Sequence, residues 1–189
     1  MTIDERLLRH ASDISGQAVV TISGEDVAQV KDVLFDPTGS VLGFTLAGRG
    51  LLSGPLKTWL PWAGVHGFGA DAIMIADDSA LIPREMGDVS DDVQGDVTGD
   101  EVLTRSGTII GRVIDAVLRL EPGVLDVVGY EVEPSDGGDP RFVPLPDTLA
   151  VNEGRLIVPD EATDFLTTDL AGFGASVDTF RERLRGETQ

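Results

Sequence analysis

Cysteine is absent from the 189-residue sequence, and histidine is nearly so, because His10 and His66 are the only imidazoles. Without thiols the chain cannot form disulfides, cysteine-ligated zinc sites, iron–sulfur clusters or a thiol nucleophile. A serine nucleophile needs an imidazole base, and no Gly-x-Ser-x-Gly motif is present. The sequence therefore predicts a protein that is not an enzyme and that has no catalytic residues, no metal site and no cofactor.

Basic charge is also scarce. The chain has 14 Lys and Arg residues against 33 Asp and Glu residues, which gives a net charge of −19, and Lys31 and Lys57 are the only lysines. A surface of this sign repels phosphate, so the composition excludes ordinary direct binding of nucleic acid. The simpler interpretation is a solvated acidic shell that keeps the protein soluble, and the alternative is a docking face for a basic partner.

Long apolar runs are missing as well. No stretch approaches the roughly 18 to 20 residues that a membrane-spanning helix needs. The first ten residues carry Asp4, Glu5, Arg6 and Arg9, where a signal peptide requires an apolar core. We expect no membrane insertion and a cytoplasmic protein.

Helical patterns occur only near the two ends. Thr2 and Glu5 have the spacing of a capping box, which allows a short N-terminal helix or only a strand leading into the first domain. Near the C-terminus, Val177, Phe180 and Leu184 recur at helical spacing after Ser176. We predict a short helix over about residues 176–185, with Ser176 as its N-cap.

Between these ends the pattern is that of β-strands. Segments of four to nine residues rich in Val, Ile, Leu and Phe are separated by Gly, Pro, Asp or Ser. The spacing predicts an all-β protein with antiparallel pairing and a hairpin turn over residues 36–39. Asp32 interrupts an apolar strand, so we expect a β-bulge or strand end there and also at Asp115. The first five predicted strands are Gln17–Ile22, Val27–Phe35, Val41–Leu46, Thr58–Trp62 and Ala72–Ala76.

The sequence contains an internal repeat. At a shift of 83 positions, the segment Asp13-Ile14-Ser15-Gly16 aligns with Asp96-Val97-Thr98-Gly99, and Leu60-Pro61 aligns with Val143-Pro144. We therefore expect a first domain over residues 1–83, an acidic linker over 84–95, a second domain over 96–160 and a C-terminal tail over 161–189.

The order of motifs in the first copy resembles the PRC-barrel family. The resemblance rests on Val-Lys-Asp-Val-Leu-Phe-Asp at 30–36, Val-Leu-Gly-Phe at 41–44, Leu-Pro-Trp at 60–62 and Asp-Ala-Ile-Met-Ile at 71–75. The second copy matches more weakly, since Asp36 aligns with Arg119 and Pro61-Trp62 with Pro144-Leu145. The resemblance implies two tandem six-stranded β-barrels.

Members of this family, which include the cytoplasmic domain of the photosynthetic reaction-centre H subunit and the barrel of a ribosome maturation factor, act in assembly rather than catalysis. The resemblance implies a cytoplasmic barrel that binds a protein partner, and a homodimer is a further possibility. Two alternatives stay open: an accessory role in ribosome or RNA maturation through a protein contact, and weak binding of a cation or small ligand.

The segment over residues 48–62 is the only part of the chain that is locally basic and rich in Trp and Leu. The corresponding loop of the second copy is polar, so the barrel itself does not require these side chains. They either close an open end of their own barrel or form an interface. The candidate interface residues are Arg49, Leu51, Leu52, Leu56, Lys57 and Trp59.

Overall fold

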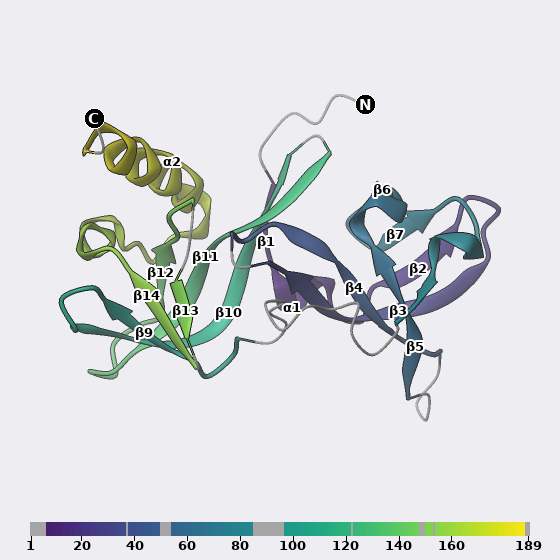
Figure 1. Ribbon diagram of the computed structural model, residues 1–189, viewed down its shortest axis with the longest axis horizontal. Helices are drawn as coiled ribbons and strands as arrows, with labels where there is room; N and C mark the ends of the chain where they lie inside the picture. The colour runs from purple at the N-terminus through teal and green to yellow at the C-terminus, as the bar shows by residue number, and fades with distance from the viewer. Residues whose placement is uncertain are drawn as a thin grey trace. The chain divides into compact units, whose positions relative to one another are not determined.

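The computed structural model describes residues 7–36, 38–49, 54–84, 97–121, 123–147, 150–152 and 154–187. These residues form two compact units (Figure 1). The first unit contains residues 11–36, 41–49 and 54–84, and the second contains residues 7–10, 38–40 and the described residues from 97 onward. The division does not follow chain order, because the N-terminal strand belongs to the second unit. Apart from Arg84, the expected linker over 84–95 lies outside the described residues.

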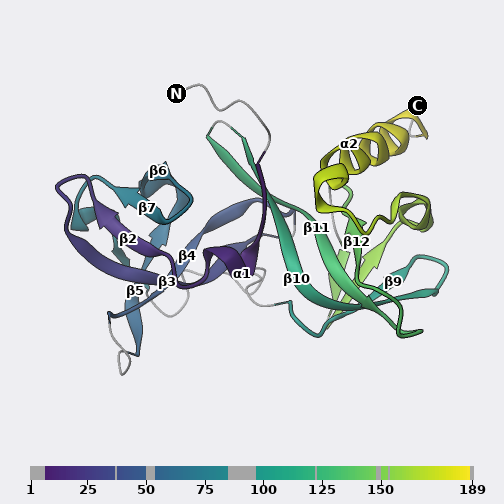
Figure 2. The same ribbon diagram turned by 180° about the vertical axis from the view of Figure 1, so that it is seen from behind.

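The first unit is a strongly curled seven-stranded sheet with the order β6-β7-β2-β3-β4-β5-β8 (Figure 2). All pairs are antiparallel except β2 with β7, which are parallel. Its strands are β2 (Ala18–Thr21), β3 (Asp26–Phe35), β4 (Val41–Ala47), β5 (Pro55–Pro61), β6 (Val65–Phe68), β7 (Ala72–Ile75) and β8 (Ile82–Pro83). All five strands that the sequence predicted are confirmed, with ends shifted by a few residues.

The second unit is also built on a seven-stranded sheet. Its order is β12-β11-β10-β9-β14-β13, and β1 pairs with β10 outside this path. Its strands are β1 (Leu7–His10), β9 (Glu101–Thr104), β10 (Ile109–Glu121), β11 (Val124–Pro134), β12 (Arg141–Pro144), β13 (Ala150–Asn152) and β14 (Arg155–Val158). The described part of the chain is therefore mostly β-structure, as expected.

Six strands of one sheet correspond to six strands of the other. β2 and β9 each lie between a long antiparallel neighbour and a parallel partner, which is β7 in the first unit and β14 in the second. β14 begins at Arg155 and β7 at Ala72, the same shift of 83 that aligns the two halves of the sequence. The seventh strand differs, because it is β8 in one sheet and β1 in the other.

The turn after β2 and the turn after β9 have the same hydrogen bonds. The Thr21 hydroxyl bonds to the Ser23 hydroxyl and accepts from the Glu25 N–H, and the Thr104 hydroxyl does the same with Ser106 and the Thr108 N–H. A glycine at positive φ completes each turn, Gly24 at +89° and Gly107 at +87°.

The long strands carry the irregularities that their acidic residues predicted. The pairing of β3 with β4 shifts register between Val30 and Asp32, and that of β10 with β11 shifts between Val113 and Asp115. The interruptions expected at Asp32 and Asp115 are therefore confirmed as shifts of register within continuous strands. A bulge increases the local twist of a strand, which helps a long strand to curl around a barrel core.

Most helices of the described residues are short. Helix α1 (Ala11–Ile14) follows β1 directly. Thr2 and Glu5, the predicted capping box, lie outside the described residues. The described residues also form three 3-10 helices: η1 (Trp62–Gly64), η2 (Asp78–Ala80) and η3 (Asp160–Phe165). None of the helices in the described ranges is long and apolar enough to cross a membrane.

The C-terminal helix α2 (Leu170–Glu187) begins earlier than predicted. Its N-cap is Asp169, whose carboxylate accepts from the Ala171 and Gly172 N–H groups at 3.1 and 3.0 Å. Ser176 was wrongly predicted as the cap, because it lies inside the helix and its hydroxyl donates to the Phe165 carbonyl. Figure 1 shows α2 lying beside β12.

Fully buried side chains hold α2 against the sheet of the second unit. Phe173 and Val177 pack into a cluster with Val117, Val128 and Phe142. Phe180 is also fully buried, and its ring lies 5.5 Å from that of Phe165. Burial of its apolar face, rather than intrinsic helix propensity, therefore stabilises α2.

Asp160 links η3 to the Thr104–Ser106 turn. We expect this contact to make a pH-dependent contribution to stability. Hydrogen bonds from the Ser106 hydroxyl, and after it the Thr104 hydroxyl, hold the pKa of Asp160 below its ordinary value of 3.8. The unfolded state then binds more protons, so this stabilisation is present above pH 3.8 and is lost as pH falls through the folded pKa.

We expect Asp160→Asn to lower the urea midpoint at neutral pH, and the difference from the wild type to shrink below pH 3.8. Urea unfolding at a series of pH values measures this. A difference of the same size at neutral and acid pH would show that the carboxylate charge does not stabilise the turn.

Candidate functional site

The candidate site lies on the edge of the first unit's sheet where β5 pairs with β8. The register places Thr58 opposite Pro83 and Trp59 opposite Ile82. The Arg84 N–H donates to the Lys57 carbonyl at 2.8 Å, so Arg84 continues the pairing opposite Lys57. Alternate residues of a strand and directly opposite residues of its partner share one face. We call this set of four residues, Lys57, Trp59, Ile82 and Arg84, the β5–β8 face.

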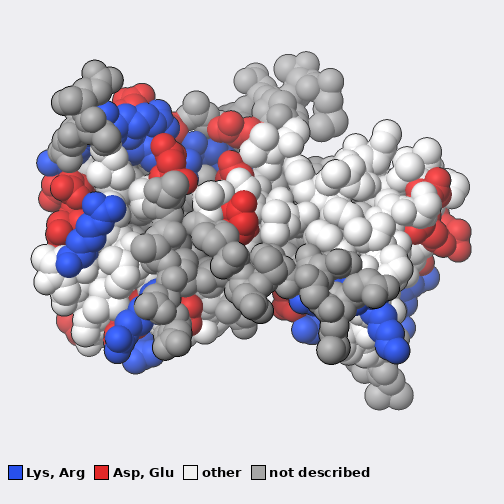
Figure 3. Space-filling view, in the orientation of Figure 1, with Lys and Arg blue, Asp and Glu red and all other residues white. Residues whose placement is uncertain are grey.

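The β5–β8 face combines exposed apolar area with positive charge. Ile82 is 40% exposed, Lys57 and Arg84 are exposed, and Trp59 is half-buried. Figure 3 shows Lys and Arg side chains near the lower end of this unit, where Figure 1 places β5. Within the described part of the chain, neither Lys57 nor Arg84 forms an ion pair. Like charges directly opposite each other destabilise a strand pair, so sheet stability does not explain this arrangement.

A rigid row of side chains supports Trp59. The register runs from Asp32 on β3 to Thr45 on β4, Trp59 on β5 and Ile82 on β8. The Thr45 hydroxyl accepts from the Asp32 N–H at 3.0 Å and donates to the Asp32 carboxylate at 3.2 Å. The Trp59 ring also lies against the backbone of Gly43. The indole is therefore held by the sheet rather than by a loop.

Of the six residues predicted as an interface, the four that the structure describes do not lie together. Lys57 and Trp59 share the β5–β8 face, whereas Leu56 is on the opposite face of β5 and is 36% exposed. Arg49 pairs with the Asp26 carboxylate at 2.8 Å and donates to the Asp26 carbonyl, so it joins the ends of β3 and β4.

Leu51 and Leu52 lie outside the described residues. Closure of its own barrel by the segment over residues 48–62 therefore stays a prediction.

The two histidines lie in different units. His10 lies on β1, where its Nε2 atom is 3.1 Å from Glu131 Oε2. His66 is exposed on strand β6. Among the described ranges, no group of three or more His, Asp or Glu side chains is arranged to hold a metal ion.

The strand order, the curl of the sheet and the supported edge define the first unit as a small all-β, barrel-type domain. Residues 8–83 match the family model of the PRC-barrel domain, and this part of the chain belongs to that family. No curated protein matches the chain. The resemblance that the sequence motifs indicated is therefore confirmed for the first copy.

Proposed function

We propose that this protein is a non-enzymatic interaction module of the cytoplasm, built from two tandem PRC-barrel domains, and that it binds a partner protein through the β5–β8 face. The single observation that carries the binding proposal is the pair of opposed cations, Lys57 and Arg84, beside Trp59 and Ile82. Trp and Arg are enriched among residues that dominate binding energy, and a rigid aromatic loses little entropy on binding.

The second barrel is supported by correspondence with the first. The strand order, the two bulges and the turns at Thr21 and Thr104 agree at equivalent positions. The β12 position corresponding to Trp59 is Phe142, which is buried under α2 in the second unit. The proposal therefore assigns partner binding to the first barrel, where Trp59 is half-buried and Ile82 beside it is 40% exposed.

Charge complementarity identifies the partner's chemistry. The β5–β8 face is positive and apolar, while the chain as a whole has a charge of −19. The matching surface is a protein segment with carboxylates around one large apolar side chain. Such a contact would weaken as salt rises, since exposed charges are screened beyond about 8 Å at physiological ionic strength.

Lys57→Glu separates partner binding from fold stability. The new carboxylate faces Arg84, so the strand pair should gain about 0.2–1 kcal/mol while binding of an acidic segment is lost. We expect capture of the partner from native lysate by the full chain to fall by about tenfold, which corresponds to roughly 1.4 kcal/mol. Quantitative mass spectrometry of the captured proteins and a urea unfolding curve measure the two effects.

Lys31→Glu is the matched control. Lys31 is the other lysine of the chain, it is exposed, and it pairs with Asp32 on β3. This variant should retain the protein that the wild type captures. If Lys57→Glu retains it too, or if both variants lose it equally, the β5–β8 face is not the binding surface.

A further inference from the structure

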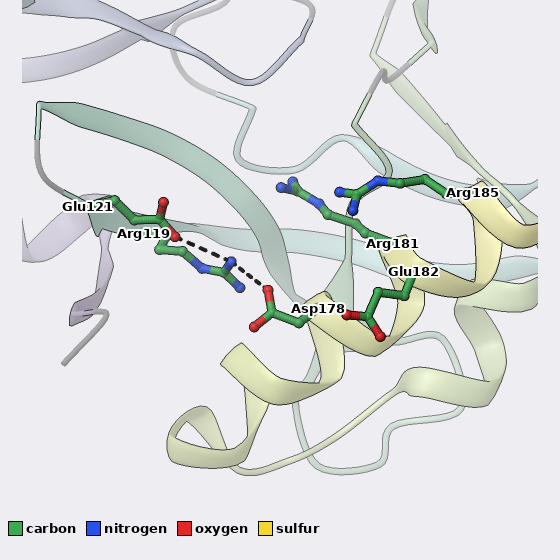
Figure 4. A pocket seen from close by; sticks show the side chains of 6 residues that line it. All are labelled: Arg119, Glu121, Asp178, Arg181, Glu182 and Arg185. Atoms are coloured by element: carbon green, nitrogen blue, oxygen red, sulfur yellow. Dashed lines mark hydrogen bonds and ion pairs between the residues drawn. The ribbon is translucent and has the colours of Figure 1, made fainter.

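A cavity of about 340 Å³ lies between β10 and helix α2, within the second unit (Figure 4). Its size falls at the lower end of the range for small-molecule sites, about 300–1,000 Å³. It is separate from the β5–β8 face and shares no residue with it. The lining is entirely charged and consists of Arg119, Glu121, Asp178, Arg181, Glu182 and Arg185.

Arg119 forms the buried floor of this cavity. Its side chain is only 7% exposed, and its Nη1 atom donates to Asp178 Oδ1 at 2.8 Å and lies 3.8 Å from Glu121 Oε1. Its Nη2 atom donates to the Gly174 carbonyl at 3.1 Å. These contacts engage the terminal nitrogens of Arg119, whereas its Nε atom is buried without a hydrogen-bond partner in the described residues. They also partly neutralise the carboxylates of Asp178 and Glu121.

Arg181 and Arg185 have free hydrogen-bond donors. Their Nε atoms lie 3.3 and 3.2 Å from the two oxygens of the Asp147 carboxylate, and Arg181 Nε also donates to the Leu145 carbonyl. The terminal Nη1 and Nη2 groups of both side chains have no protein acceptor within the described part of the chain. Figure 4 shows the two guanidinium groups next to each other on the same side of α2.

This arrangement concentrates positive charge on one wall. Arg181 is 16% exposed, and burial is the main cause that lowers the pKa of its guanidinium. Asp147 acts in the opposite direction, while the neighbouring charges of Arg119 and Arg185 lower the pKa further, and Asp126 raises it. One Asp147 carboxylate thus contacts both guanidinium groups through their Nε atoms, and the charge of Asp126 also acts on Arg181.

Docking of α2 does not require these free donors. The buried side chains Phe173, Val177 and Phe180 already hold the helix, and Arg119 pins it through Asp178. One arginine would be enough to form an ion pair with Asp147. The terminal nitrogens of both arginines therefore remain available to a ligand, since the part of the chain that the structure describes supplies no acceptor for them.

We propose that this cavity binds a small soluble phosphate monoester, with the phosphate group held by the terminal nitrogens of Arg181 and Arg185. A phosphate monoester carries a charge of about −1.5 to −2 near neutral pH, which matches two guanidinium groups better than a single carboxylate does. Its oxygens accept paired N–H groups, the bidentate geometry that arginine provides. Glu121 and Glu182 on the remaining wall would accept from hydroxyl or ammonium groups of the ligand.

Isothermal titration calorimetry of the full chain with glycerol 3-phosphate tests the proposal. We expect saturable binding that is tighter than binding of inorganic phosphate, and none with sodium chloride at the same ionic strength. Arg185→Gln should weaken binding by about tenfold or more, because it removes charge-assisted hydrogen bonds. Arg185 is 64% exposed, so the variant should keep the thermal stability of the wild type.

Arg183→Gln is the matched control on the same helix. Arg183 pairs with Asp164 at 3.2 Å and lies over the Phe165 ring, away from the cavity lining. This variant should bind glycerol 3-phosphate like the wild type. Absence of saturable binding in the wild type, or equal weakening by Arg183→Gln and Arg185→Gln, would overturn the proposal. Equal affinity for glycerol 3-phosphate and inorganic phosphate would show that the cavity binds only the phosphate ion, and this would overturn the assignment of a phosphate monoester.

Discussion

Phe173→Ala is expected to lower the free energy of unfolding by about 3–5 kcal/mol, the range for removing a buried aromatic ring. Phe173 is fully buried in the cluster that holds helix α2, and its ring lies 5.3 Å from that of Phe142. A ring atom also occupies the space over Gly129, where a Cβ would come within 2.2 Å of it. Removing the ring leaves a cavity that these neighbours cannot fill.

Urea unfolding followed by far-ultraviolet circular dichroism measures the loss. Thr179→Ala, on the exposed side of the same helix, is the control and should change stability by no more than about 0.5 kcal/mol. If Phe173→Ala proved as stable as Thr179→Ala, α2 would not be docked through this cluster.

Gly43→Ala is expected to destabilise the first unit by at least about 2 kcal/mol. Gly43 has a φ of +154°, and a Cβ built there would lie 2.2 Å from the Leu60 carbonyl oxygen and 2.9 Å from the Trp59 ring. The nearest atom belongs to the backbone of the paired strand, so β4 and β5 would have to separate. The same change should therefore displace Trp59 and weaken partner binding.

Gly24→Ala measures the destabilisation caused by backbone conformation alone, without crowding of the new Cβ. Gly24 also has a positive φ, +89°, but a Cβ there meets no atom within 4 Å. It should cost only the conformational penalty, about 1–2 kcal/mol. Thermal unfolding of the two variants, together with their intrinsic tryptophan fluorescence, measures the comparison. Equal losses and unchanged fluorescence for both would contradict the close approach of β5 to Gly43.

Local patterns in the sequence predicted most of the sheets. Short apolar segments bounded by Gly, Pro and Asp indicate β-strands, and this spacing can be recognised from neighbouring residues alone. Asp32 and Asp115 predicted bulges because a charged residue cannot continue the buried side of a strand without changing register. The pairing of β1 with β10 could not be predicted this way, since it joins residues far apart in the chain.

The start of helix α2 shows where local patterns fail. Asp169 and Ser176 are both good N-cap residues, and Gly172 and Gly174 lower the intrinsic helix propensity between them. The sequence therefore favoured the later start. Burial of Phe173 outweighs the glycines, because tertiary packing contributes more to a helix than propensity does.

Half of the candidate site was visible in the sequence. Lys57 and Trp59 stood out as basic and aromatic residues in an acidic chain. Ile82 and Arg84 were missed because Arg84 was assigned to the linker and the two-residue strand β8 carries too little pattern to detect. Arg49 was included by proximity in sequence, although its guanidinium pairs with Asp26. Side-chain alternation along β5, which separates Leu56 from Trp59, becomes decisive only once the register is known.

Site-specific photocrosslinking from position 57 tests the central claim most directly. A photoreactive amino acid replaces Lys57 in the full chain. In a control variant of the same chain it replaces Lys31 instead. We predict one discrete adduct with an acidic partner protein from position 57, weakened by salt, and no such adduct from position 31. Adducts that are the same from both positions, an adduct made only of two copies of this chain, or no adduct from position 57 would contradict the assignment of the β5–β8 face as a docking site for a partner protein.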